Sequence, residues 1–342
     1  MADIVILLLC LILIVISSNL FCNALEHFGE KLGISEGVTG SVFAAIGTAL
    51  PETIIPIIAI LTADHNNISN VNNEIGIGAI LGAPLMLSTL SLFLMSISVI
   101  TKRGINGTIN PEPTGLKRDL KFFLLSYGIV FLTIFAQGYF FSKIFNIICA
   151  IVLAGCYILY LVLTFKSSNQ LVVDGHNTEA TEKLTIQHLG FKVNFLSIFL
   201  QIIFAMWLLI YFANMFINSI KHISGAYNLS PFLLSLIIIP IATEMPEKLN
   251  SIIWLRKFKD TLAIGNITGA MVFQSSLLPI IGILFTDWRL TNAIQLTGII
   301  ITFIATIIFY LNACREKIKV WHFFINGLLY LLNIVICIQL FY

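Results

Sequence analysis

The stretch Gly47-Thr48-Ala49-Leu50-Pro51-Glu52 places a proline and a carboxylate inside a long apolar run. An ionised carboxylate at the middle of a membrane helix costs roughly 2.5 to 3.5 kcal/mol on insertion scales. Such an acid therefore usually faces a bundle interior or a water-filled cavity. Pro51 has no N–H, so the carbonyl of Gly47 loses its helical partner. This carbonyl, the Thr48 hydroxyl and the Glu52 carboxylate are hard oxygen ligands of the kind that bind hard cations.

A second stretch, Ala242-Thr243-Glu244-Met245-Pro246-Glu247, repeats the Thr-x-x-Pro-Glu pattern in another long apolar run. Pro246 frees the carbonyl of Ala242 in the same way. We therefore expect two broken helices whose carboxylates, Glu52 and Glu247, face one another and share a cation near the middle of the membrane. Each threonine lies four residues before its glutamate, on the same helical face. Its hydroxyl either completes the ligand shell or bonds back to its own helix.

The composition is that of an integral membrane protein. Of 342 residues, 58% are hydrophobic and 11% are charged, and several apolar runs reach the roughly 20 residues that span a bilayer. We predict an all-α integral membrane fold of ten transmembrane helices, at about residues 3–22, 37–61, 74–100, 119–137, 143–165, 191–218, 229–254, 260–285, 290–312 and 319–341. The six cysteines lie in apolar runs without metal-ligand spacing, and no basic patch with interleaved aromatic residues is present. Neither a cofactor nor a nucleic-acid partner is expected.

Lysine and arginine residues gather in alternate connecting segments. Fifteen lie in segments that follow odd-numbered spans, and three lie in segments that follow even-numbered spans. By the positive-inside rule, the odd-numbered segments are cytoplasmic. We therefore expect a multi-pass protein of the plasma membrane with both termini outside.

The two halves of the chain are copies of one another. A shift of 195 positions places Glu52 on Glu247, and a shift of 187 places residues 78–89 on residues 265–276. Five spans is an odd number, so the halves have opposite orientations. Inverted repeats with helices broken at the membrane midplane are typical of secondary transporters. We predict a first five-helix repeat at 1–165 with its motif at 42–95, a cytoplasmic linker at 166–190, and a second repeat at 191–342 with its motif at 235–285.

The second half carries polar residues that the first half lacks. Glu244 and Lys248 are four residues apart, so they can pair on one helical face. Alternatively, Lys248 snorkels towards the cytoplasm or acts as a fixed cation that modulates the site. Gln274 is a further candidate ligand, and the position that matches it in the first half is Leu87, so we expect an asymmetric site. Small residues that allow close helix packing stand at Gly78, Gly82, Gly265 and Gly269.

At these residues the chain resembles the calcium/cation antiporter superfamily, which contains the sodium/calcium exchangers. That family has two inverted five-helix halves, each with a Gly-Thr-Ser-x-Pro-Glu motif in its second helix and a Gly-Asn-x-x-Gly-Ser-Asn motif in its third. The resemblance implies that Glu52 and Glu247 are the central calcium ligands and that the two threonines add oxygens. It also implies that the carbonyls of Gly47 and Ala242 belong to flanking sodium sites.

The chain departs from the family pattern at polar positions. The serine of the first motif is replaced by Ala49 and Glu244, and the last asparagine of the second motif by Pro84 and Met271. The acidic or asparagine position of the third helix holds Leu87 and Gln274. In the family these groups serve sodium, so the departures bear on sodium coupling.

We therefore expect a secondary active antiporter, not an enzyme, that exchanges Ca2+ for Na+ or H+ by alternating access. Its expected partners are the lipid bilayer and inorganic cations. The alternatives are an antiporter for Mn2+, Mg2+ or K+, a passive channel, and an intramembrane metal-dependent enzyme. The enzyme would need acids near a membrane face with basic residues to hold phosphate, whereas the acids here lie in mid-span. The candidate ligands are Glu52, Glu247, Thr48, Thr243, Gln274, Glu244, Gly47 and Ala242.

Overall fold

The computed structural model describes residues 2–31, 50–63, 71–137, 143–172, 183–190, 192–227, 229–258, 260–290, 293–315 and 317–341. Its helices are α1 (Ala2–Lys31), α4 (Leu50–Leu61), α5 (Val71–Met86), the π-helix η2 (Leu87–Ser91), α6 (Leu92–Arg103), α7 (Pro113–Gln137), α8 (Lys143–Val172), the 3-10 helix η3 (Thr185–Leu189), α9 (Phe195–Tyr227), α10 (Pro231–Arg256), α11 (Asp260–Phe285), α12 (Ala293–Ala313) and α13 (His322–Phe341). Two short strands, β1 (Thr108–Ile109) and β2 (Ile318–Lys319), pair antiparallel. α5, η2 and α6 follow one another without a break.

Eight helical stretches of the described chain are long and apolar enough to cross a membrane. Two further apolar stretches, Glu52–Leu61 and Pro231–Ile241, are shorter. They lie in the predicted second and seventh spans, where the acidic motifs stand. The described structure thus confirms an all-helical integral membrane protein.

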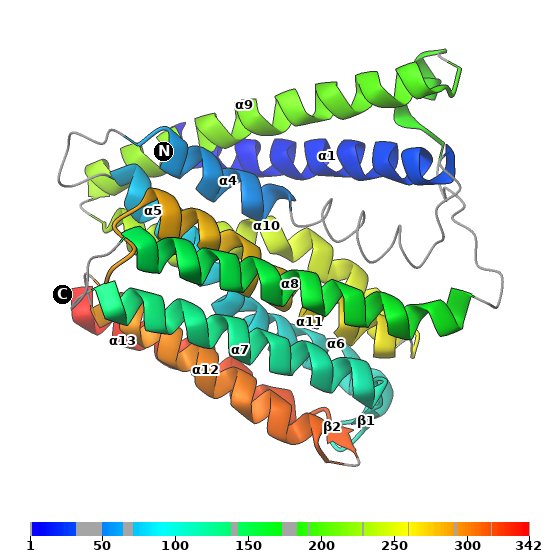
Figure 1. Cartoon of the computed structure of the whole chain (residues 1–342), viewed down its shortest axis with the longest axis vertical. Helices are drawn as coiled ribbons and strands as arrows, with labels where there is room; N and C mark the ends of the chain where they lie inside the picture. Colours follow the sequence, from blue (N-terminus) through cyan, green and yellow to red (C-terminus); the bar gives the residue numbers. More distant parts are fainter. Residues whose placement is uncertain are drawn as a thin grey trace.

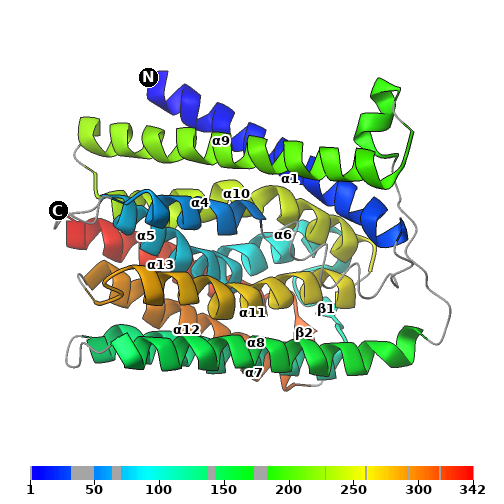
Figure 2. The same cartoon turned by 45° about the horizontal axis from the view of Figure 1, so that its top comes forward.

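The helices lie side by side in a bundle (Figures 1 and 2). α1 packs along α9 on one flank, α4, α5, α10 and α11 form the centre, and α7, α8, α12 and α13 cover the opposite flank. Large apolar side chains stay exposed along the outer helices, for example Leu8 on α1, Ile151 on α8 and Leu196 on α9. Extended apolar surfaces of this kind suit a lipid surround.

The start of α1 and the end of α13 lie at the same end of the bundle, as an even number of spans requires (Figures 1 and 2). The strands β1 and β2 lie at the opposite end. There Arg103, the last residue of α6, pairs with Asp260, the first residue of α11, with Nη2–Oδ1 at 2.6 Å and Nη1–Oδ2 at 2.8 Å. Arg103 also donates to the carbonyls of Thr108 and Leu255. A guanidinium and a carboxylate, 5% and 9% exposed, thus join the end of α6 to the ends of α10 and α11.

Asp260→Ala is expected to lower the free energy of unfolding by about 3 kcal/mol, because it leaves the Arg103 guanidinium buried without its carboxylate. Thermal unfolding of the purified protein in detergent measures this loss as a drop of several degrees. The matched control is Asp287→Ala, which breaks the exposed Arg289–Asp287 pair at 3.8 Å and is expected to leave the midpoint unchanged. Equal effects of the two substitutions would contradict the importance of the buried pair.

A π-helix, η2, interrupts the rod between α5 and α6. Such bulges disturb the regular backbone ladder, and they occur often at functional sites. Asn326 of α13, fully buried, donates from Nδ2 to the carbonyl of Ser88 in η2 at 2.7 Å and to that of Ala305 in α12 at 3.1 Å. This side chain therefore ties η2 to two neighbouring helices.

Asn326→Leu is expected to destabilise the protein by about 1 to 3 kcal/mol, because two buried carbonyls lose a hydrogen-bond donor. The thermal midpoint in detergent checks the effect. Asn214→Leu is the control, since Asn214 is only partly buried and donates an exposed hydrogen bond within α9, to the carbonyl of Ile210 at 2.9 Å. An unchanged midpoint in Asn326→Leu would show that η2 does not depend on this bond.

The predicted break of helix 7 is wrong at the level of secondary structure. α10 is a continuous α-helix from Pro231 to Arg256 and passes through Pro246. A proline removes one bond of the ladder while the bonds on either side remain, so a long helix can continue through it. The break of helix 2 stays a prediction, because the structure describes α4 only from Leu50.

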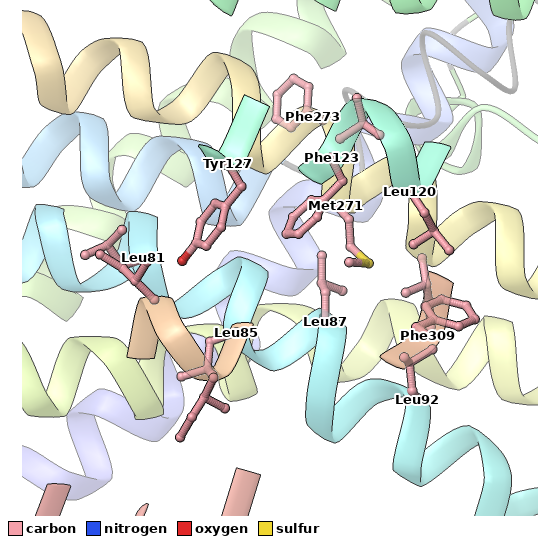
Figure 3. Close-up of a cluster of buried hydrophobic side chains, with 14 of the residues drawn as sticks. Leu81, Leu85, Leu87, Leu92, Leu120, Phe123, Tyr127, Met271, Phe273 and Phe309 are labelled. Atoms are coloured by element: carbon pink, nitrogen blue, oxygen red, sulfur yellow. The ribbon is translucent and has the colours of Figure 1, made fainter. Parts of the chain in front are cut away.

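An apolar core fills the space between η2, α5, α6, α7, α11 and α12, and Figure 3 shows part of it. Leu87, the counterpart of Gln274, is fully buried in this cluster together with Phe123 and Met271. The first half therefore uses this position for packing.

Candidate cation site

One face of α10 carries a line of buried polar side chains. Glu244, Lys248 and Ser251 follow one another at spacings of four and three residues, which places them on the same helical face. Glu244 is 0% exposed and Lys248 is 1% exposed. Ser251 accepts a hydrogen bond from Asn266 Nδ2 of α11 at 2.9 Å. This polar face of α10 is therefore turned towards α11.

The carboxylate of Glu244 contacts Lys248 on its own helix and Gln274 on α11. Lys248 Nζ lies 3.5 Å from Oε2, and Gln274 Nε2 of α11 donates to Oε1 at 2.7 Å. Of the predicted alternatives for Lys248, pairing with Glu244 is confirmed, and snorkelling to the bundle end is wrong because the side chain is fully buried. A long cationic side chain stays inside when a carboxylate lies within its reach, since leaving an isolated charge there is costly.

Gln274 is 2% exposed, and its amide orientation follows from its partner. An ionised carboxylate only accepts hydrogen bonds, so the NH2 group of the amide must face Glu244. The amide oxygen then points away from Glu244 and has no hydrogen-bond partner among the described residues. The structure thus brings Gln274, a predicted ligand, next to Glu244 with an oxygen left over.

Thr243 is buried, and its hydroxyl donates to the carbonyl of Ile239 at 2.9 Å. This is the back-bonding alternative that is common for threonine in helices. Because the hydroxyl donates, both lone pairs of its oxygen remain available as acceptors.

Glu52 lies in the first turn of α4 and is 2% exposed. α4 packs against α5 and also touches α9, α10 and α11, so the carboxylate lies inside the bundle rather than against lipid. Gly47 and Thr48 fall outside the described residues, and Ala242 and Glu247 are described only through the backbone of α10. The meeting of Glu52 with Glu247 therefore stays a prediction.

The third helix of each half shows the same local hydrogen bonds. Ser88 donates to the carbonyl of Leu85 at 3.2 Å, and Ser275, 187 positions later, donates to that of Val272 at 3.2 Å. Thr89 bonds to the same Leu85 carbonyl, as Ser276 does to that of Val272. The hydroxyl pairs of the two halves are thus placed alike, although η2 is a π-helix and α11 is not.

Glycines bring α5 and α10 into contact. A Cβ atom on Gly82 would lie 2.2 Å from the carbonyl oxygen of Leu236, and one on Gly78 would lie 2.7 Å from that of Phe232. The predicted packing role of these two glycines is confirmed. For Gly265 and Gly269 the packing role stays a prediction. Among the described residues, a Cβ atom on Gly265 would have no neighbour within 4 Å, and one on Gly269 would have only the Tyr160 hydroxyl, at 3.7 Å.

Two contacts near the site were missed by the sequence reasoning. Asn266 binds Ser251, and Thr268 Oγ1 donates at 2.7 Å to Oδ2 of the buried Asp119 on α7. Both α11 residues lie between glycines in a stretch that was interpreted as a packing face. Their polarity was a signal for interhelical bonds, but the partners could not be chosen before the packing of the helices was known.

The chain matches the sequence pattern of the family described as sodium/calcium exchanger protein over residues 2–166 and 197–339. It belongs to the sodium/calcium exchanger protein family. This is a family of membrane transporters, so the chain is a cation antiporter, and membership argues against an intramembrane enzyme.

Several relatives span most of the chain. The uncharacterized membrane protein MJ0091 of Methanocaldococcus jannaschii is 24% identical over 336 residues, which cover 97% of this chain and 95% of that protein. The putative antiporter CaxA of Alkalimonas amylolytica is 23% identical, with 80% and 77% of the two chains covered.

Solved structures share the fold. The crystal structure of the H+/Ca2+ exchanger CAX superposes with a TM-score of 0.73 at 17% identity and covers 97% of this chain and 82% of that one. The sodium-calcium exchanger NCX_Mj, soaked with Na+ and Ca2+, gives a TM-score of 0.58 at 20% identity with 98% of both chains covered.

Proposed function

We propose that this antiporter exchanges Ca2+ for Na+ or H+ by alternating access around one site at the middle of the membrane. The observation that carries the proposal is a buried carboxylate, Glu52, inside the helical bundle of a chain that belongs to an exchanger family. Acids inside membrane bundles mark ion pathways by default, because they are too costly to retain for packing alone.

Glu52 and Glu247 are the proposed charged ligands. Gln274 supplies an amide oxygen, and Thr48 and Thr243 supply hydroxyl oxygens. The carbonyls of Gly47 and Ala242 complete the set, since each lies four residues before a proline that cannot donate to it. All of these are hard oxygen donors, which suit calcium. Glu244 is the remaining candidate ligand. It differs from the other candidates because its carboxylate already contacts Lys248 and Gln274.

Ten membrane spans in two inverted five-helix repeats are the topology that we propose for the helical bundle. The matching hydroxyl bonds of Ser88 and Ser275 support the repeat, as does the placement of both chain ends at one end of the bundle. The basic connecting segments favour a cytoplasmic location for the other end and a plasma-membrane protein with both termini outside.

The counter-ion is a choice between sodium and protons. The solved structures that share the fold include one described as an H+/Ca2+ exchanger and one described as a sodium-calcium exchanger. Either ion can compete with calcium for the same carboxylates, and this competition couples the two fluxes without further chemistry. Mn2+, Mg2+ and K+ are the alternative cargo ions for such a site.

Calcium-45 uptake into proteoliposomes tests the function. The purified protein is reconstituted and exposed to external calcium under an outward sodium gradient, an outward proton gradient, or neither. We expect one gradient to drive uptake above that of protein-free liposomes and dissipation of that gradient to stop it. Uptake that is equal with and without gradients would indicate a channel, and absence of uptake under all conditions would refute calcium transport.

A further inference from the structure

The second half of the bundle contains a lysine where a transporter of cations would be expected to avoid one. Lys248 follows directly after the proposed ligand Glu247, and its ammonium group is fully buried 3.5 Å from Glu244. A fixed positive charge so near a cation site repels the cargo unless a negative charge cancels it. Glu244 supplies that charge from the same helical face.

Glu244 also holds the amide of Gln274 by a hydrogen bond of 2.7 Å. Both of its carboxylate oxygens thus face donors, Lys248 Nζ on one side and Gln274 Nε2 on the other. The amide dipole is fixed with its NH2 group towards Glu244 and its oxygen away, where no described residue binds it. A carboxylate engaged in this way orients a ligand rather than serving as one.

The charge of the site follows from this arrangement. The formal charges of Glu52, Glu244, Glu247 and Lys248 add up to minus two, because the ammonium group offsets one of the three carboxylates. A buried site crosses the membrane at low cost only when its charge is neutralised. One divalent cation or two monovalent cations satisfy this condition, and both cannot be bound together.

We infer that Lys248 is a tethered cation that occupies Glu244 permanently, in the place that a transported monovalent cation would otherwise fill. This limits the site to a single divalent cation, makes monovalent cations purely competitive with it, and leaves Gln274 positioned by Glu244 to offer its amide oxygen to the cargo. The inference rests on the proposed function and specifies how many cations the site accepts.

Calcium titrations of the purified protein test this role, with sodium chloride varied against choline chloride at constant ionic strength. In the wild type, sodium should only weaken calcium binding. Lys248→Gln raises the formal charge of the site to minus three and frees the place of the ammonium group, so low sodium should strengthen calcium binding by about tenfold before higher sodium competes. Lys257→Gln is the matched control, because it removes an exposed lysine beyond the end of the same helix and should behave as the wild type.

Charge compensation gives a second, independent measurement. Glu244→Gln lowers the formal charge of the site from minus two to minus one, and we expect at least a hundredfold loss of calcium affinity. The double variant Glu244→Gln with Lys248→Gln restores the charge of the site and should regain most of that affinity together with purely competitive sodium. The sodium response separates this role from a structural one, because a loss of stability alone would not change whether sodium strengthens or weakens calcium binding.

The outcomes distinguish a failure of the tethered-cation inference from a failure of the proposed calcium transport. Purely competitive sodium in Lys248→Gln contradicts the tethered cation, as does an unchanged calcium affinity in Glu244→Gln. If Lys248→Gln does not fold, Glu244→Gln and the double variant decide. Absence of both calcium binding and gradient-driven flux in the wild type contradicts the proposed function instead.

Discussion

Glu52→Gln is expected to reduce gradient-driven calcium uptake to the level of protein-free liposomes. The carboxylate is 2% exposed inside the bundle, and the amide keeps its size while removing its charge. If Glu52 is one of two charged ligands of a divalent cation, its neutralisation removes half of the compensating charge in a medium that screens weakly. We expect a loss of affinity of roughly a hundredfold or more, equivalent to about 3 kcal/mol.

Calcium-45 uptake and calcium titration of the same preparation measure this loss, and size-exclusion chromatography confirms that the variant is folded. Glu112→Gln provides the control, because Glu112 is an exposed glutamate whose two oxygens accept the backbone N–H groups of Thr114 and Gly115 at the start of α7. Its amide retains an acceptor oxygen, so transport should persist. Normal uptake in folded Glu52→Gln would remove this carboxylate from the site.

The positions of the helices were predictable because apolar length is a strong signal. α11 coincides with the predicted span at 260–285, and most other helices begin or end within a few residues of prediction. The exceptions extend beyond the predicted apolar spans. α8 continues to Val172, past the predicted end at 165, because hydropathy marks where a helix meets lipid rather than where its backbone stops being helical.

The π-helix η2 and the Arg103–Asp260 pair were not predictable in this way. A π-helix depends on partners such as Asn326, which lies 238 positions from Ser88 in the sequence. The ion pair joins residues 157 positions apart. Local patterns carry no information on such contacts, since the partners are chosen when the helices pack.

The candidate site also contains features that were predictable from the sequence and features that were not. The buried acids were recognisable from the sequence because a charge inside an apolar run requires an explanation. The bond from Gln274 to Glu244 was not, because it depends on the register between α10 and α11. The expected asymmetry between Leu87 and Gln274 is confirmed in the described structure, with Leu87 in the apolar core and Gln274 in the polar cluster.

Gly82→Ala is expected to prevent the close packing of α5 against α10, so that most of the protein molecules fail to fold. The added Cβ would lie 2.2 Å from the carbonyl oxygen of Leu236 and 2.8 Å from Cγ of Pro240. The first of these atoms belongs to the backbone, so no side-chain rotation relieves the collision and the helices must separate. Overpacking costs about 1 to 3 kcal/mol when side chains can adjust, and we expect at least the upper end here. The consequence reaches the site, because α10 carries Glu244 and Lys248.

Chromatographic homogeneity and the thermal midpoint in detergent check this expectation. Gly155→Ala in α8 and Gly128→Ala in α7 are the matched controls, since a Cβ at either position meets no described atom within 4 Å. Alanine is the better helix former by about 0.5 to 1 kcal/mol, so both controls should be neutral or slightly stabilising. A folded Gly82→Ala protein with an unchanged midpoint would mean that α5 and α10 are not held at this distance. The close approach that sets the geometry around Glu244 would then have to come from elsewhere in the bundle.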